Sequence, residues 1–225
     1  MSNPFLRLFS KPVPSALPSA SPSAQPSPSP SKSPSKSPSE QPSTTPYDCG
    51  ADCRTLLTTF DANTSGKGNI FKVQAVQDIV ITGFTIHTTN AGSGTVKIWD
   101  RTGDYVGSEG DPEAWNLIMN EGFTGAGFGQ QTPLADLGVP ILILAGTFRS
   151  FYVYSSLGVQ YTNGSVEGSI YSTNAGEIIF YEGKGTAGEI GAVTYAPRVW
   201  NGIIQYGLAT DIVTVPISPA VPLPS

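Results

Sequence analysis

The sequence predicts an all-β domain, an antiparallel β-sandwich of jelly-roll type, behind a disordered N-terminal stalk rich in Pro and Ser. Segments of β-branched and aromatic residues recur at intervals of about 10 to 15 residues, and Gly, Asn, Asp and Pro separate them. Every segment of helical length contains Gly or Pro, or alternates with a period of two. Many short strands joined by Gly-rich turns are typical of a sandwich or a barrel.

These segments predict strands at residues 70–75, 78–87, 95–100, 115–124, 147–155, 159–162, 177–182 and 203–206. Asn163-Gly164 predicts a hairpin turn between 159–161 and Val166, because both residues tolerate positive φ. Residues 183–188 have the Gly-x-Gly-x-x-Gly spacing of dinucleotide sites, but residues 189–197 lack the pattern of the helix that such a site needs. We therefore expect a Gly-rich turn at 183–188.

The chain is expected to divide into three parts: a linker over 1–46, the sandwich domain over 47–208 and a Pro-rich tail over 209–225. Pro recurs at every fourth position from Pro14 to Pro46, and Ser follows nearly every one. Such a tract offers no apolar surface to offset chain entropy, so it predicts a disordered, extended spacer. It is either an inert linker or a carrier of O-linked sugars.

Charge divides along the same boundary. The whole chain carries −5, of which residues 1–46 contribute about +3, so the remainder carries about −8. An acidic domain lacks the basic stripe that binds phosphates, which argues against nucleic acid and against an anionic membrane surface. No apolar run approaches the roughly 20 residues that span a bilayer, so membrane insertion is not expected.

Several strings in the domain resemble those of a β-sandwich module found in secreted bacterial and microalgal proteins. They are residues 103–117, 145–146 ahead of 151–153, 161–164 and 196–202. The resemblance implies export and modular attachment, but it implies no activity and no site residues. The first ten residues, interrupted by Pro4 and Arg7, do not form a clear signal-peptide core, and this is where the chain departs from the pattern.

Cys49 and Cys53 stand where the stalk meets the domain, and we expect a local disulfide between them. Such a bond implies an oxidising compartment. Asn63 and Asn163 begin Asn-x-Ser sequons and are candidate glycosylation sites. Together these features predict an extracellular or cell-surface location.

Acidic residues gather between residues 100 and 113. Glu109, Asp111 and Glu113 match the Glu-x-Asp-x-Glu pattern of jelly-roll glycoside hydrolases, but the intervening Pro112 predicts a loop in place of a rigid strand. With Asp100 and Asp104 they are also candidate calcium ligands, because Ca²⁺ favours flexible loops of carboxylates. The preferred interpretation is a solvated acidic loop, with calcium as the alternative and no other cofactor expected.

His87 is the only histidine, so a cluster of histidine metal ligands is excluded. Its parity along residues 79–89 places it with Gly83 and Thr85, opposite Val80 and Phe84, and we expect it to face solvent.

Aromatic residues provide the candidate ligand site. Lys97 and Trp99 share one face of their strand, and Tyr152 and Tyr154 share a face of theirs. Exposed rings on a sandwich face can stack on sugars or anchor a protein partner. The alternative is that loops cover this face and the rings form a core.

The sequence therefore predicts a non-enzymatic extracellular or cell-surface binding or adhesion module whose partner is a glycan or a wall component. A carbohydrate-active enzyme on the same sandwich, which would use scattered carboxylates, is one alternative. A purely structural wall protein is the other.

Overall fold

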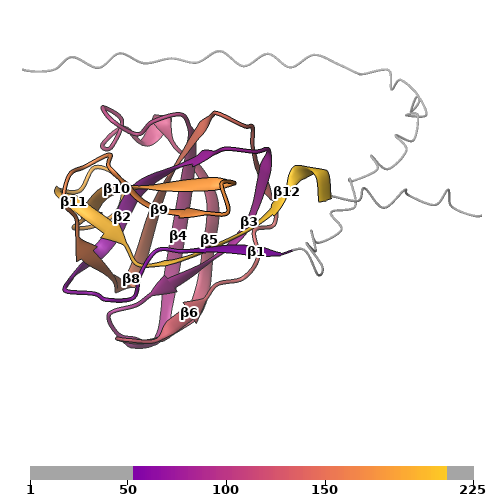
Figure 1. Cartoon of the computed structure of the whole chain (residues 1–225). Helices are drawn as coiled ribbons and strands as arrows, with labels where there is room; N and C mark the ends of the chain where they lie inside the picture. Colours follow the sequence, from indigo (N-terminus) through magenta and orange to yellow (C-terminus); the bar gives the residue numbers. More distant parts are fainter. Residues whose placement is uncertain (1–52, 212–225) are drawn as a thin grey trace, which may run out of the picture. The chain divides into compact units, whose positions relative to one another are not determined.

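The computed structural model of the protein describes residues 53–211 (Figure 1). The expected linker, 1–46, and nearly all of the expected tail, 209–225, lie outside the described residues. Within 53–211 the protein is all-β, and two antiparallel sheets form a β-sandwich. This confirms the predicted all-β class and the sandwich arrangement. The helical elements of this part are two 3-10 turns, η2 (Pro112–Ala114) and η3 (Ala209–Asp211). No helix in this part is long and apolar enough to cross a membrane.

The smaller sheet has five strands. Its order is β1 (Arg54–Leu57), β12 (Gly202–Leu208), β3 (Ile79–His87) and β6 (Gln131–Pro133), and β7 (Ile141–Ile143) also pairs with β3.

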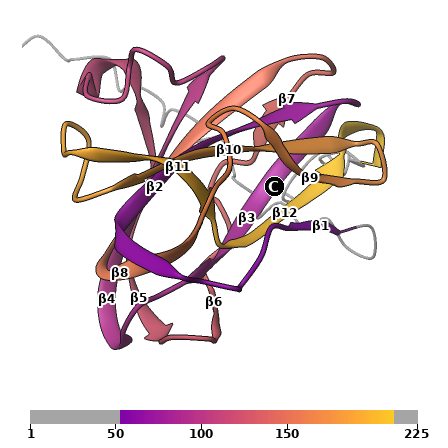
Figure 2. The same ribbon diagram turned by 60° about the vertical axis from the view of Figure 1, so that its left-hand side comes forward.

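The larger sheet has seven strands. Its order is β11 (Thr194–Trp200), β10 (Ile178–Thr186), β2 (Thr64–Ala75), β8 (Phe148–Asn163), β4 (Ala91–Thr102) and β5 (Asn116–Ala126), and β9 (Ile170–Asn174) pairs with β10. Strand β11 also pairs with the end of β8, so β2, β8, β10 and β11 curl toward one another at this end (Figure 2).

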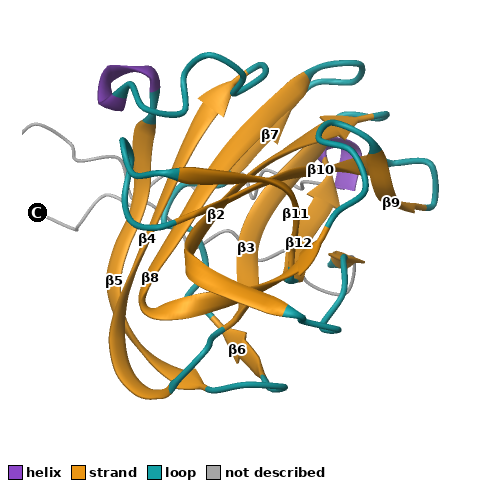
Figure 3. Ribbon diagram, turned by 90° about the vertical axis from the view of Figure 1, so that its left-hand side faces the viewer, coloured by secondary structure: helices purple, strands orange, loops and turns teal. Residues whose placement is uncertain are grey.

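The two sheets face each other (Figure 3), and the main hydrophobic core consists of buried side chains from strands of both sheets. The rings of Phe71 and Trp200 stack with centroids 4.7 Å apart, and Phe84 of the small sheet meets Phe151 of the large sheet edge to face at 5.2 Å. All four side chains are fully buried. Burying a side chain of this size stabilises the fold by roughly 1.5 to 3 kcal/mol, so these contacts hold the two sheets together.

Each predicted strand overlaps an observed one, but two of them, 147–155 and 159–162, are halves of the single strand β8. The interruption between them is a local irregularity, where Gly158 has φ of +79° and the pairing of β2 with β8 shifts between Gly66 and Gly68. The sequence patterns missed β1, β6, β7, β9 and β11.

The hairpin predicted at Asn163-Gly164 is wrong. Asn163 ends β8, and the next strand, β9, pairs with β10. The Gly164 amide instead donates to the Pro197 carbonyl, because β11 lies beside the end of β8. The predicted turn at 183–188 is also wrong over its first four residues, since Gly183 to Thr186 belong to β10 and the chain leaves the strand only at Ala187.

Candidate binding groove

The aromatic residues predicted to bind ligand lie on the outer face of the large sheet, but they are not an open surface. Trp99 is 9 % exposed and Tyr152 is fully buried. They pack with Ile70 and with Tyr105 and Trp115, which belong to the segment between β4 and β5. The open face is therefore not found, and the alternative interpretation holds: this segment folds back over the sheet, and the rings form a second, smaller core.

Hydrogen bonds and ion pairs fasten the covering segments to the sheet. Lys184 of β10 contacts Glu109 at 2.6 Å and Glu167 at 3.3 Å. Tyr105 donates to Glu167 at 3.0 Å, and burial raises the pKa of its phenol, reinforced by the charge of Glu167. On the other side the Tyr152 hydroxyl donates to the Gly188 carbonyl at 2.9 Å.

Lys97 and Tyr154 stand at the margin of this small core. The Lys97 ammonium pairs with Glu189 at 2.7 Å and lies 6.0 Å from the centre of the Trp99 ring. Tyr154 is partly buried and packs against the cluster. The face that sequence parity identified is therefore real, but loops cover most of it.

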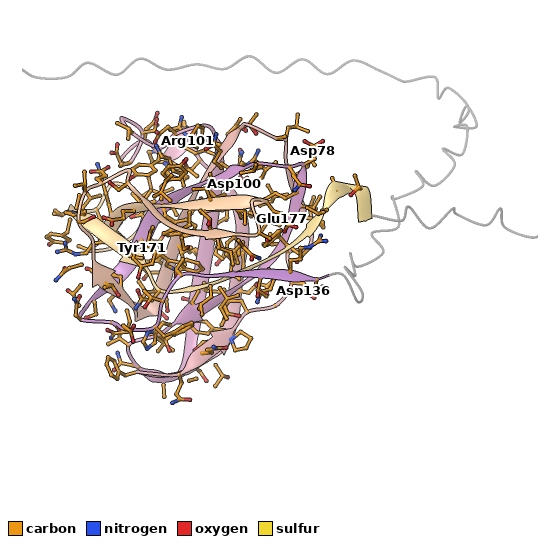
Figure 4. The ribbon with its side chains drawn as sticks, in the orientation of Figure 1. Asp78, Asp100, Arg101, Asp136, Tyr171 and Glu177 are labelled. Carbon is orange, nitrogen blue, oxygen red and sulfur yellow. The ribbon has the colours of Figure 1, made fainter. Side chains whose placement is uncertain are left out.

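The structure does not bring the candidate calcium ligands together. Asp100 is buried and accepts from Arg149 Nε at 2.6 Å, while its neighbour Arg101 lies 5.8 Å from the centre of the Trp115 ring (Figure 4). Asp104 pairs with Lys72. Within residues 53–211 there is no group of three or more acidic, His or Cys side chains that could hold a metal ion.

The predicted loop at Glu109, Asp111 and Glu113 is confirmed. Asp111 caps η2 by accepting from the Glu113 amide at 3.1 Å, and Glu113 is exposed. Burial would raise the pKa of Glu109, but the hydrogen bond and charge of Lys184 outweigh it and lower the pKa below its usual range. The three carboxylates therefore do not share one face of a strand, as the hydrolase pattern requires.

His87 does not face solvent, so that expectation was wrong. Its side chain is fully buried, with ring centroids 5.1 Å from Phe60 and 5.7 Å from Phe128. Nε2 accepts a hydrogen bond of 2.6 Å from the Gly129 amide, and burial lowers the pKa of the imidazole. Segments before β2 and after β5 cover this face of β3, which strand parity alone does not reveal.

Cys53 is the first described residue, and Cys49 lies outside the described residues, so their disulfide stays a prediction. Asn63 and Asn163 are both exposed and lie side by side, and the backbone amide of Asn163 donates to Asn63 Oδ1 at 2.9 Å. Their glycosylation also stays a prediction.

An open groove of about 550 Å³ lies where the start of β2, the middle of β8, the turn after β3 and the ends of β10 and β11 meet. None of its residues is among the candidate site residues predicted from the sequence. Its side chains include Ser65, Lys67, Asn90, Tyr161, Tyr195 and Arg198.

Two glycines leave room for the ring of Tyr161, which forms the floor of this groove. The Tyr161 ring is buried, and a Cβ on Gly66 would lie 2.8 Å from its hydroxyl oxygen. A Cβ on Gly185 would lie 2.6 Å from Cζ of the same ring. Burial raises the pKa of Tyr161 although the nearby Arg198 opposes that shift. The ring can therefore lie across β2 and β10 only because both strands carry glycine where it crosses them.

The walls of the groove are polar and carry positive charge. Lys67 Nζ donates to the Ser156 carbonyl at 2.8 Å, and the Arg198 guanidinium carbon lies 5.8 Å from the centre of the Tyr161 ring. Asn90 Nδ2 donates to the Leu157 carbonyl at 3.0 Å. Tyr195 is 47 % exposed, which leaves much of its ring open to solvent. None of the described residues that line the groove is acidic.

A second hollow, of about 510 Å³, lies beside β5 and β7. It is lined largely by apolar groups, and Leu117, Val139 and Leu142 are exposed there. Its charged residues, Asp100 and Arg149, are paired with each other. It offers fewer free polar groups to orient a ligand than the groove beside Tyr195 does.

No protein-family model and no curated protein matches this chain.

The residues of the groove come from five parts of the sequence. The pairs Gly66-Lys-Gly68 and Gly183-Lys-Gly185 were the signal that could have pointed to it, because glycines at alternate positions of a strand clear one face for a close neighbour.

Proposed function

We propose that this chain is a non-enzymatic extracellular or cell-surface binding module, a jelly-roll-like sandwich on a Pro/Ser stalk, that recognises a glycan or a wall component through the groove beside Tyr195. The observation that carries the proposal is the combination of a half-exposed aromatic ring with polar side chains in one open groove.

The groove has the two kinds of group that a sugar needs. An exposed ring such as Tyr195 can pack against the apolar face of a sugar and has few rotatable bonds to immobilise. Hydroxyl and amide side chains, here Ser65 and Asn90, can exchange hydrogen bonds with sugar hydroxyls. An open site suits an internal stretch of a long polymer, because both ends of the bound segment must leave it.

The groove favours binding over hydrolysis. Glycoside hydrolysis by the usual two-carboxylate mechanism requires a pair of acidic groups about 5 to 9.5 Å apart on either side of the scissile bond. The described lining residues supply no Asp or Glu, and Glu109 is already engaged by Lys184.

The test is binding of the full-length chain to an array of plant, algal and bacterial wall glycans, followed by calorimetry on any ligand found. Tyr195→Ala should weaken binding at least tenfold. Tyr171→Ala is the matched control, because Tyr171 is a similarly exposed tyrosine (39 %) on β9, outside the groove (Figure 4).

Two results would overturn the proposal. One is failure to bind any glycan or isolated wall polysaccharide. The other is release of sugar products that Glu113→Gln abolishes, which would support the hydrolase alternative.

A further inference from the structure

We infer that the groove takes an anionic glycan, a polysaccharide that carries carboxylate or sulfate groups; this inference rests on the proposed function. It comes from how the positive charges of the described domain are partnered.

The described residues contain eight Lys and Arg side chains, and five of them form ion pairs with Asp or Glu. The five are Arg54, Lys72, Lys97, Arg149 and Lys184. The other three, Lys67, Arg101 and Arg198, have no acidic partner within 4.0 Å in residues 53–211. Two of these three, Lys67 and Arg198, line the groove.

This placement runs against the charge of the domain as a whole. Residues 53–211 carry 8 basic and 14 acidic side chains, a net charge of −6. Carboxylates outnumber cations, and five of the eight cations form ion pairs with them, yet the two cations of the groove form none within residues 53–211. Two like charges without a counter-charge are unfavourable together, and an anionic ligand would relieve their repulsion.

Both cations have donors left for a ligand. An ammonium group has three N–H donors, and Lys67 uses one of them in its hydrogen bond to the Ser156 carbonyl. A guanidinium has five N–H donors, and Arg198 uses one on Nη1 to donate to the Pro197 carbonyl at 2.7 Å. Its Nε is buried without a partner, so the donors left for a ligand are on the two terminal nitrogens. A guanidinium matches the paired oxygens of a carboxylate or a sulfate.

The neutral groups explain why the anion should belong to a sugar polymer. Tyr195 can hold a sugar ring near Arg198, because both residues line the groove. A free anion would use the cations but would make no use of the exposed Tyr195 ring. The expected ligand is therefore a charged sugar unit within a longer chain.

The experiment measures binding of the full-length chain to three soluble polymers: a polyuronate, a sulfated galactan and a neutral glucan. We expect binding to at least one of the charged polymers and an affinity for the glucan at least tenfold lower. Added NaCl should weaken binding to the charged polymer, because salt screens exposed charges. The two charged polymers separate a carboxylate ligand from a sulfated one.

Variants test the two cations directly. Arg198→Gln and Lys67→Gln should each lower affinity for the charged polymer by about tenfold to a hundredfold, since hydrogen bonds to charged groups are among the stronger ones. Arg198→Lys keeps the positive charge and should lose less affinity for the charged polymer than Arg198→Gln does. Lys97→Gln makes the same change in net charge outside the groove and should leave affinity unchanged. Melting temperatures establish that each variant is folded.

The outcomes separate the inference from the proposed function. Equal binding of neutral and charged polymers, or Arg198→Gln with unchanged affinity, would overturn the inference and leave a glycan-binding module. Equal losses in Lys97→Gln and Arg198→Gln would also overturn it, because net charge and not the groove would then control binding. If none of the three polymers and no glycan of the wider array binds, both the inference and the proposed function are overturned.

Discussion

The hydroxyl of Tyr206 donates a hydrogen bond of 2.8 Å to Oε2 of Glu177, and both side chains are buried. Tyr206 belongs to β12 of the small sheet, whereas Glu177, which Figure 4 labels, directly precedes β10 of the large sheet. Asn174 Nδ2 donates to the same hydroxyl at 2.7 Å, and Arg54 lies 3.5 Å from Glu177. A small polar network thus joins the two sheets at their edge, where the apolar core ends.

Tyr206→Phe should destabilise the protein by about 1 to 3 kcal/mol, because Glu177 would lose a donor while remaining buried. Equilibrium unfolding in urea measures this change. Tyr195→Phe is the control, since the Tyr195 ring is exposed, and it should change the free energy of unfolding by less than about 0.5 kcal/mol. Equal effects of the two variants would show that the network adds little to stability.

Gly185→Ala should cost about 1 to 3 kcal/mol, because the new methyl group would lie 2.6 Å from the Tyr161 ring and would force the ring or the strand to move. Thermal or urea unfolding detects the loss. At Gly138 an added Cβ meets no atom within 4 Å, so Gly138→Ala should be neutral or slightly stabilising. A fully stable Gly185→Ala protein would mean that Tyr161 does not lie as the structure places it.

His87 should titrate below its ordinary pKa of 6.5, because burial disfavours the charged imidazolium. Because His87 is the sole histidine of the sequence, its imidazole C–H signals in the NMR spectrum need no assignment, and their shift with pH gives the pKa directly. A folded-state pKa below the unfolded one means that its contribution to stability is complete above about pH 6.5 and is lost as the pH falls toward the folded pKa. The free energy of unfolding should thus fall from pH 7.5 to pH 5.5, and less so in His87→Gln. A midpoint at or above 6.5 contradicts this prediction.

Lys184→Met should loosen the segment that covers Trp99, because Glu109 and Glu167 would lose their shared cation. We expect a loss of about 1 to 2 kcal/mol and faster amide hydrogen exchange between residues 104 and 115. Lys67→Met removes a lysine that contacts none of this segment and should leave that exchange unchanged. Unchanged exchange in Lys184→Met would show that apolar packing alone holds the cover in place.

The sequence by itself determined the all-β class and where most long strands lie. Alternation of β-branched and aromatic residues is a local property, and it located β2, β3, β4, β5, β8, β10 and β12. Strands of three residues, such as β6 and β7, are too short to alternate, and β11 contains Pro197, which weakens the pattern.

Only the tertiary structure decided which faces are open. Parity correctly placed Trp99 and Tyr152 on one side of their sheet and His87 on one side of β3, but exposure depends on which distant segment covers that side. The groove shows the same limit, because the pairings of β2 with β8 and of β10 with β11 bring Gly66, Gly185 and Arg198 around Tyr161. Local patterning specifies strands, whereas burial and sites depend on contacts between residues far apart in the chain, which no local pattern encodes.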